Sequence, residues 1–241
     1  MFYQVLEPKY DPTFSDSSYG FRPGRSPIDA ISKVREKYDE GYKYAVGIDL
    51  EKFFDRMQHE FLMNILRERI KDKTMIHLIK KFLRAGVILP DGLVHVTREG
   101  APQGGPLSPL LSNIYLDKLD KELERRGHVF VRSADDQLIL LKSPRATERV
   151  RDSMTRFIED ELKLKVNSDK TETGSLRRLK FLGFKLTRTK EGTGITIHQK
   201  AIKKFKRRII AITKRNRGVS LERVPSELKS YMKGWIGYFG V

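Results

Sequence analysis

The sequence predicts an α+β fold in which an antiparallel sheet packs on helices. Serine–proline pairs recur along the chain, and several are followed by apolar residues at the spacing of a helix. Between these segments lie short apolar runs, two of which flank a tight turn and so predict a hairpin of neighbouring strands. Helices mixed with antiparallel strands are typical of α+β domains.

The individual elements follow from local signals of the same kinds. The first 25 or so residues are punctuated by proline and glycine and are predicted to be a loop. Residues 100–107 carry too much glycine and proline for regular structure. The elements predicted elsewhere are helices at 27–41, 59–70, 75–85, 108–119, 144–162, 201–213 and 231–239, and strands at 44–50, 129–131, 138–141, 181–184 and 195–197.

The composition is that of a globular protein. Of the 241 residues 39% are hydrophobic, which is enough to bury a substantial core. There is no cysteine, so disulfides and thiolate metal sites are excluded. No apolar run approaches the ~20 residues that span a bilayer, and the first residues lack the layout of a secretory signal. We therefore expect no membrane association and a bacterial cytoplasmic location, with an organelle as the alternative.

Positive charge is concentrated in the C-terminal third. The net charge of the chain is +17, of which residues 170–241 contribute +15 and residues 1–169 only +2. Basic segments release counterions when they bind phosphates, so this pattern favours a nucleic-acid partner. A solubilising face or an anionic membrane surface is the alternative that charge alone leaves open.

Three carboxylates stand where apolar strands end. Asp49 follows the run 46–48, and Asp135 with Asp136 separates the two strands of the predicted hairpin. Buried acids are costly unless something pairs with them, and magnesium is a cation that prefers such hard oxygen ligands. With two ions ~4 Å apart, one activates an attacking 3′ hydroxyl and the other stabilises a leaving pyrophosphate. Ordinary turn chemistry is the alternative for each acid taken separately.

A phospho-acceptor receiver domain also combines an acid pair, a single aspartate and a lysine. In receivers the pair comes first, within a repeating parallel strand–helix unit. Here the single Asp49 precedes the pair by 86 residues, and the pair lies in a hairpin. The order of the acids therefore excludes a receiver domain.

The order of four motifs closely resembles that of reverse transcriptases. These motifs are IDLEKFFD at 48–55, APQGGPLSP at 101–109, SADD at 133–136 and FLGF at 181–184. Two of the sequence features, YGFRPGRS at 19–26 and PQGGPLSP at 102–109, are similar to proteins encoded by group II introns. Such proteins carry out reverse transcription and assist intron splicing (maturase activity). The resemblance covers essentially the whole chain.

The resemblance implies a reverse-transcriptase palm with partial fingers and the start of a thumb. We expect a partial fingers segment at 1–45, the catalytic palm at 46–190, and the basic start of the thumb and maturase region at 191–241. Most of the fingers and the rest of the thumb are expected to be absent from this sequence. A fragment, a minimal variant and a degenerate copy all remain open.

The resemblance also implies a catalytic centre with two magnesium ions. Asp49 and Asp135 would be the principal metal ligands, with Asp136 assisting and the Leu50 carbonyl completing the shell. Phe54 would be the steric gate that selects deoxynucleotides. The remaining implied roles belong to Gln103, Gly104 and Lys170 at the nucleotide, Leu182 and Gly183 at the primer end, and Lys203, Lys204, Lys206, Arg207 and Arg208 on RNA phosphates.

One position departs from the family pattern. Residue 133 is normally tyrosine, whose ring packs near the primer terminus, and here it is serine. Both carboxylates of the motif remain. We therefore expect weaker primer positioning and lower activity, but intact metal binding.

The function that these features imply is RNA-directed DNA polymerisation. The partners would be an RNA template or intron RNA, a DNA primer and deoxynucleoside triphosphates. One alternative is a maturase-like splicing factor that binds intron RNA without polymerising, because the basic C-terminal third alone would suffice for binding. The other is a palm fragment that folds and does neither. The sequence does not specify an oligomeric state.

Overall fold

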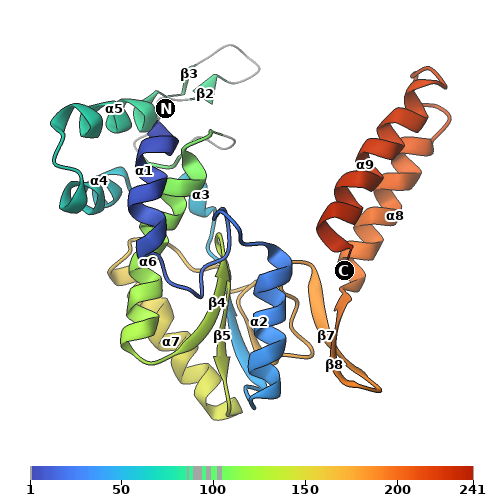
Figure 1. The fold of residues 1–241 in the computed structure, drawn as a ribbon, viewed down its shortest axis with the longest axis horizontal. Helices are drawn as coiled ribbons and strands as arrows, with labels where there is room; N and C mark the ends of the chain where they lie inside the picture. Colours follow the sequence, from blue (N-terminus) through green and yellow to red (C-terminus); the bar gives the residue numbers. More distant parts are fainter. Residues whose placement is uncertain (1, 86, 89–93, 96–98, 102–104, 241) are drawn as a thin grey trace.

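The computed structural model describes residues 2–85, 87–88, 94–95, 99–101 and 105–240, and it confirms the α+β class. A four-stranded antiparallel sheet lies at the centre, with helices on both of its faces (Figure 1). The strand order is β4-β5-β1-β6, so β1 and β5 are the inner strands. The bounds are Tyr44–Ile48 for β1, Val129–Ser133 for β4, Asp136–Leu141 for β5 and Glu172–Ser175 for β6.

The rest of the described chain forms helices and two short antiparallel ribbons. The helices are α1 (Phe2–Tyr10), α2 (Pro27–Asp39), α3 (Phe53–Arg56), α4 (His59–Arg69), α5 (Lys73–Arg84), α6 (Ser108–Arg125), α7 (Pro144–Asp160), α8 (Gln199–Thr213) and α9 (Arg223–Phe239), with a 3₁₀ turn at Asp11–Thr13. The ribbons are β2 (Val87–Ile88) with β3 (Val94–His95), and β7 (Phe184–Thr189) with β8 (Gly192–Ile197).

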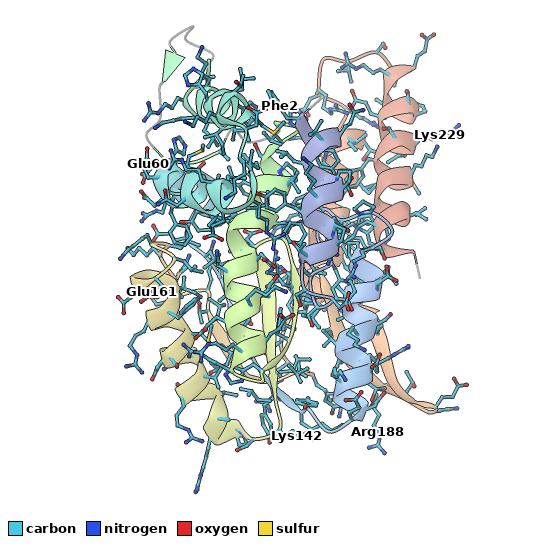
Figure 2. The ribbon with its side chains drawn as sticks, turned by 60° about the vertical axis from the view of Figure 1, so that its left-hand side comes forward. Phe2, Glu60, Lys142, Glu161, Arg188 and Lys229 are labelled. Carbon is cyan, nitrogen blue, oxygen red and sulfur yellow. The ribbon has the colours of Figure 1, made fainter. Side chains whose placement is uncertain are left out.

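Each face of the sheet has its own hydrophobic core. On one face, side chains of β1 and β5 pack with α6, α7 and the helices around them. On the other face, alternate residues of the same strands pack with α2 and β7. Figure 2 shows α6 beside α1, α4 and α7, with the labelled Glu60 on the outer side of α4 and Glu161 directly after the end of α7. This double cover explains why the inner strands are apolar along almost their whole length.

Local helix signals place the start of α2 correctly. The Ser26 hydroxyl accepts from the Asp29 amide at 3.2 Å, and the Asp29 carboxylate accepts from the Ser26 amide at 2.8 Å. This reciprocal capping box satisfies two amide groups that have no partner within the helix. Pro27 occupies the first helical position, where its missing N–H costs nothing.

Two local predictions were wrong. The expected N-terminal loop contains α1, because Leu6 and Tyr10, four residues apart, bury one helical face in the core despite Pro8. The expected strand at 181–184 starts only at Phe184. Residues 181–184 instead form a tight two-residue turn closed by reciprocal backbone hydrogen bonds of 3.0 and 2.8 Å between Phe181 and Phe184.

Helices α8 and α9 form an antiparallel pair that continues from the β7–β8 ribbon, beside the main body (Figure 1). Phe205 of α8 packs on Tyr231 and Trp235 of α9, with ring centroids 5.7 and 4.4 Å apart. Within these two helices Ile212 is the one residue that is fully buried. No helix in the described ranges is long and apolar enough to cross a membrane.

Candidate active site

The sheet brings the three predicted catalytic acids to one of its ends. Ile48 of β1 pairs with Gln137 of β5, so Asp49 follows β1 beside the start of β5, where Asp136 lies. Asp135 sits in the turn that joins β4 to β5. All three acids line one cavity of about 530 Å³. Antiparallel pairing of strands that are far apart in the sequence has therefore gathered the carboxylates that the motifs predicted.

The turn that carries Asp135 is tight and strained. Ser133 pairs with Asp136, which leaves Ala134 and Asp135 as the two residues of the turn. Ala134 has a φ of 58°, a left-handed conformation that is unfavourable for a residue with a Cβ atom. Ser133, the last residue of β4, is buried and lies directly opposite Asp136. It occupies the position at which the family pattern has tyrosine. Something outside the turn must hold this conformation.

The cavity contains groups of both charges. Its wall includes acids and lysines that the sequence reasoning did not single out, namely Asp169, Glu172, Lys180 and Lys200. The two lysines lie 20 residues apart, on the segment before the 181–184 turn and on α8. Nothing in the local sequence distinguishes them from other lysines of the basic C-terminal third, so only the fold identifies them.

The pKa of Asp136 is raised from 3.8 to about 6. Solvent reaches the residue at the mouth of the cavity, but protein atoms surround its carboxyl group, and this burial is the largest cause. The Leu182 amide and the Lys180 charge lower the pKa, and the charges of Asp135 and Asp49 raise it. The three acids are therefore close enough to influence one another electrostatically.

Asp49 and its neighbours are positioned by the segment that precedes β6. The Asn167 amide donates to the Asp49 carbonyl at 2.8 Å, and the Glu51 amide donates to the Lys165 carbonyl at 2.8 Å. These two bonds flank Leu50 and do not use its carbonyl. Lys170 follows in the same segment, with its Nζ 4.0 Å from Oδ1 of Asp49 and its side chain largely exposed. The structure thus places Lys170 beside Asp49.

The donor chemistry of the cavity suits a hard divalent cation. Its acids are carboxylates, the ligands that magnesium prefers, and no cysteine or histidine lies in the cavity wall that the structure describes. Among the described residues, however, no three acidic or histidine side chains are close enough together to hold an ion as a ready-made cluster. The residues fit magnesium by type and by convergence on one cavity.

The other residues predicted to contact the nucleotide are not among the described residues that line this cavity. Phe54 lies on α3, half-buried and edge-on to Phe53 with ring centroids 5.3 Å apart, and it is not part of the described wall of the cavity. Phe53 is fully buried, as expected of a core aromatic. Gln103 and Gly104 lie outside the described residues.

Leu182 and Gly183 are the two central residues of the 181–184 turn. Both have positive φ, 51° and 83°, which is the pattern of a type I′ turn. The Leu182 amide donates to Oδ2 of Asp136 at 3.3 Å, so the predicted primer-end segment touches a predicted metal ligand. A Cβ atom on Gly183 would lie 2.9 Å from the Phe239 ring, so glycine is also required by close packing against α9.

A second cavity adjoins the first. It has a volume of about 770 Å³ and shares Asp136, Lys180 and Lys200 with the first cavity. Leu182 and Gly183 line it, together with the aromatic residues of α9. The aromatic residues near the C-terminus were expected to be packing residues. They do pack, on Phe184 and Phe205, but Tyr231, Trp235, Tyr238 and Phe239 also form a wall of this cavity.

The five basic residues assigned to RNA phosphates all lie on α8. Lys203, Lys204, Lys206, Arg207 and Arg208 are exposed, and none of them forms an ion pair with another described residue. Lys204 also reaches the second cavity. The cations are therefore available to a polyanion, whereas Lys37 of α2 and Lys118 and Arg125 of α6 are paired with nearby acids.

Known proteins share these features. Residues 1–186 match the family of reverse transcriptases (RNA-dependent DNA polymerases), and residues 202–241 match the maturase-specific domain of group II introns. A solved telomerase from Candida albicans, in complex with a fragment of telomeric RNA, superposes with a TM-score of 0.61 at 16% identity. That similarity covers 95% of this chain and 44% of the telomerase chain, and at this identity it supports the fold.

Two relatives that are similar in sequence are also intron-encoded proteins. The putative COX1/OXI3 intron 2 protein of Saccharomyces cerevisiae is 44% identical over 122 residues, which are 51% of this chain and 14% of that protein. The group II intron-encoded protein LtrA of Lactococcus lactis is 40% identical over 134 residues, or 56% of this chain and 22% of LtrA. The chain thus spans less than a quarter of either relative. By the match of residues 1–186, the chain belongs to the reverse transcriptase (RNA-dependent DNA polymerase) family.

Proposed function

We propose that this chain forms the catalytic palm of an RNA-directed DNA polymerase of the group II intron type, in the bacterial cytoplasm or an organelle. The observation that carries the proposal is the convergence of Asp49, Asp135 and Asp136 on one cavity lined by three lysines. Carboxylates beside cations suit a site that receives a triphosphate together with a divalent ion.

In this proposal Asp49 and Asp135 hold magnesium, assisted by Asp136 and the Leu50 carbonyl. Two bound ions would activate the primer 3′ hydroxyl and stabilise the leaving pyrophosphate. Lys170 contributes positive charge for the triphosphate from the Asp49 side of the cavity. Lys180 and Lys200 do so where the two cavities meet. Neutralising a triphosphate needs several cations, and these three lysines lie in the cavity wall.

The primer end lies in the second cavity. The Leu182–Gly183 turn and the aromatic wall of α9 offer a platform for the terminal nucleotide next to Asp136. Phe54, Gln103 and Gly104 retain their expected roles at the incoming deoxynucleotide. The exposed cations of α8 bind phosphates of the RNA template or of intron RNA.

The proposed division into parts is fingers segment 1–45, palm 46–190 and thumb or maturase region 191–241. Its second boundary falls in the turn between β7 and β8, since β7 ends at Thr189 and β8 begins at Gly192. The reverse-transcriptase match ends within β7, at residue 186, and the maturase match begins after β8, at residue 202.

Primer extension on an RNA template with magnesium tests the proposal. The unaltered chain should extend the primer, and Asp135→Ala should abolish extension because it removes a principal metal ligand. RNA affinity should stay largely intact in that variant, since RNA binding is assigned to the five exposed cations of α8 and not to Asp135. Asp169→Ala is the matched control, because Asp169 lines the same cavity without an assigned metal role. Equal extension by the Asp135→Ala variant would contradict the proposal.

The second candidate function is a maturase-like factor that binds intron RNA without polymerising. The match of residues 202–241 to the maturase-specific domain and the unpaired cations of α8 favour it. No extension by any variant, together with salt-dependent binding of intron RNA, would support this candidate. Absence of both activities would identify an inactive palm fragment.

A further inference from the structure

We propose that Arg132 is a positioning residue of the catalytic centre: fully buried, it holds the carbonyl of Ala134 and thereby fixes the turn that presents Asp135. Residues 17–20, which lead into the YGFRPGRS motif and include its first two residues, fix the same turn from its outer side. The inference rests on the proposed function only where it takes Asp135 to be a metal ligand. The effect of Arg132 on the conformation of the turn does not depend on that function.

The contacts of Arg132 point at the turn. Its side chain is fully buried, and its Nε and Nη2 atoms donate to both oxygens of the equally buried Asp120 at 2.8 and 2.6 Å. This forked pairing fixes the plane of the guanidinium group. Nη1 is thereby directed to the Ala134 carbonyl at 2.9 Å and to Oδ1 of Asn113 at 3.0 Å. The buried guanidinium group of Arg132 therefore donates a hydrogen bond to the peptide group that joins Ala134 to Asp135.

Asn113 connects this network to the outer segment. Its Oδ1 accepts from Arg132, and its Nδ2 donates to the Gly20 carbonyl at 2.8 Å. The backbone of Arg132 is held by the same segment, because its amide donates to Ser17 at 2.9 Å and its carbonyl accepts from Tyr19 at 2.8 Å. Residues 17–19 therefore cover the free edge of β4 along the last residues before the turn.

Gly20 lies directly against the turn. A Cβ atom at this position would lie 2.2 Å from the Ala134 amide nitrogen and 2.8 Å from the Ser133 carbonyl carbon. Backbone atoms cannot yield as a flexible side chain could, so even a methyl group would displace the turn or the segment. The requirement for glycine here is close approach and not conformational freedom.

A second buried arginine braces the outer segment itself. Arg22 donates to the carbonyls of Ser15 and Ser18 at 2.7 and 3.0 Å and pairs with Asp11 at 2.7 Å. The loop that covers β4 is therefore rigid enough to act as a support. The first four residues of the motif, Tyr19 to Arg22, thus gain a structural role that the active-site assignment does not supply.

The positioning role explains how a strained turn persists. The left-handed Ala134 is unfavourable alone, and such residues survive only where the surroundings determine them fully. The alternative is that Arg132 and Asp120 merely stabilise the palm core. Buried ion pairs often add little net stability compared with apolar residues, so a core role would not by itself require charge here.

The first test replaces the pair by apolar residues of similar size, in the double variant Arg132→Met/Asp120→Leu. This change leaves no buried charge unpaired and so spares global stability, while it removes the hydrogen bond to Ala134. Hydrogen exchange of the full chain is followed by mass spectrometry. We expect exchange in residues 133–137 to accelerate ~10- to 100-fold, the effect of losing one charged hydrogen bond, with the rest of the palm unchanged.

Gly20→Ala tests the support from the other side and leaves the ion pair in place. Gly24→Ala is its control, because Gly24 has a φ of 67° but no atom within 4 Å of an added Cβ. Accelerated exchange at 133–137 is expected in the first variant and not in the second. Unchanged exchange in both the double variant and Gly20→Ala would overturn the inference, as would acceleration spread over the whole palm.

Manganese binding, measured by electron paramagnetic resonance, tests whether the conformation of the turn affects metal affinity. The double variant should bind Mn²⁺ ~10- to 100-fold more weakly than the unaltered chain, the usual effect of losing support behind metal ligands. Equal affinity in a variant with a loosened turn would overturn the link to the metal. Failure of the unaltered chain to bind Mn²⁺ would instead contradict the proposed function, and the exchange data would still decide the positioning role.

Discussion

The palm and the α8–α9 pair are built on opposite principles. The palm buries side chains on both faces of its sheet, and α6 alone contributes eleven buried residues. In α8 and α9 one residue, Ile212, is fully buried. Charge shows the reverse distribution, since residues 199–239 carry +10 of the net charge of +17. The palm is held together by its own core, whereas the helix pair leaves most of its side chains at least partly exposed.

This difference teaches where single substitutions should act. A change to a buried core residue of the palm should alter folding first and function through folding. A change in α8 or α9 should alter binding with little effect on folding. Figure 2 illustrates the second case, in which Lys229 of α9 points away from the rest of the molecule.

The largest expected effect is on stability. Leu111→Ala should lower the free energy of unfolding by about 2–5 kcal/mol, because Leu111 is fully buried in α6 and its truncation leaves a cavity. The matched change Leu221→Ala should alter it by less than ~0.5 kcal/mol, since Leu221 is 88% exposed. Urea denaturation measures both. Similar losses of unfolding free energy in the two variants would contradict the difference in packing between the palm and the region of α8 and α9.

The next effect is on RNA affinity. Replacing Lys203, Lys204, Arg207 and Arg208 by alanine should weaken RNA binding by up to ~100-fold at moderate salt, with a salt dependence reduced by up to about three ion equivalents. The melting temperature should hardly change, because these side chains are exposed.

The control for this variant removes the same charge from the palm. It replaces four exposed basic residues by alanine, namely Arg145, Arg149, Arg156 and Lys163. RNA affinity measured by filter binding over a range of salt should fall much less in this control. Equal losses would mean that RNA responds to net charge and not to the α8 surface.

A third effect concerns pH and the palm alone. Burial, with the nearby charge of Asp120, raises the pKa of Asp117 to about 6. The folded state therefore holds this proton more tightly than the unfolded chain, and stability falls as pH rises from about 4 to 6. Asp117→Asn should add about 1–3 kcal/mol at pH 7 and little at pH 4. Denaturation at both values tests this, and an equal gain at both would contradict it.

The smallest effect concerns the departure at position 133. Ser133→Tyr should raise the rate of primer extension a few-fold, because an aromatic ring opposite Asp136 would restore a contact near the primer terminus. Mn²⁺ affinity should stay the same, as the carboxylates are untouched. Ser133→Ala serves as the control for loss of the hydroxyl. An unchanged extension rate in the tyrosine variant would show that position 133 does not limit primer positioning.

Local patterns were sufficient for most elements and for the acids. The capped start of α2 and the β4–β5 hairpin depend on interactions between residues close in the sequence, so their signals are readable there. The acids were recognisable because a carboxylate beside buried apolar strands is energetically costly unless a cation or hydrogen-bond donor pairs with it. By contrast, α1 was predicted as loop because its helix is stabilised by burial of Leu6 and Tyr10 in a distant core. Lys180 and Lys200 carried no signal at all.

The sequence by itself determined the class of fold, the family and the identity of the three carboxylates, because each is expressed in short motifs and local periodicity. Only the tertiary structure decided which lysines face the acids, that Arg132 reaches the peptide before Asp135, and that Gly20 touches the same turn. The physical reason is distance along the chain. Contacts between residues 20, 113, 120 and 132 arise only when separate elements pack, and no local pattern encodes them.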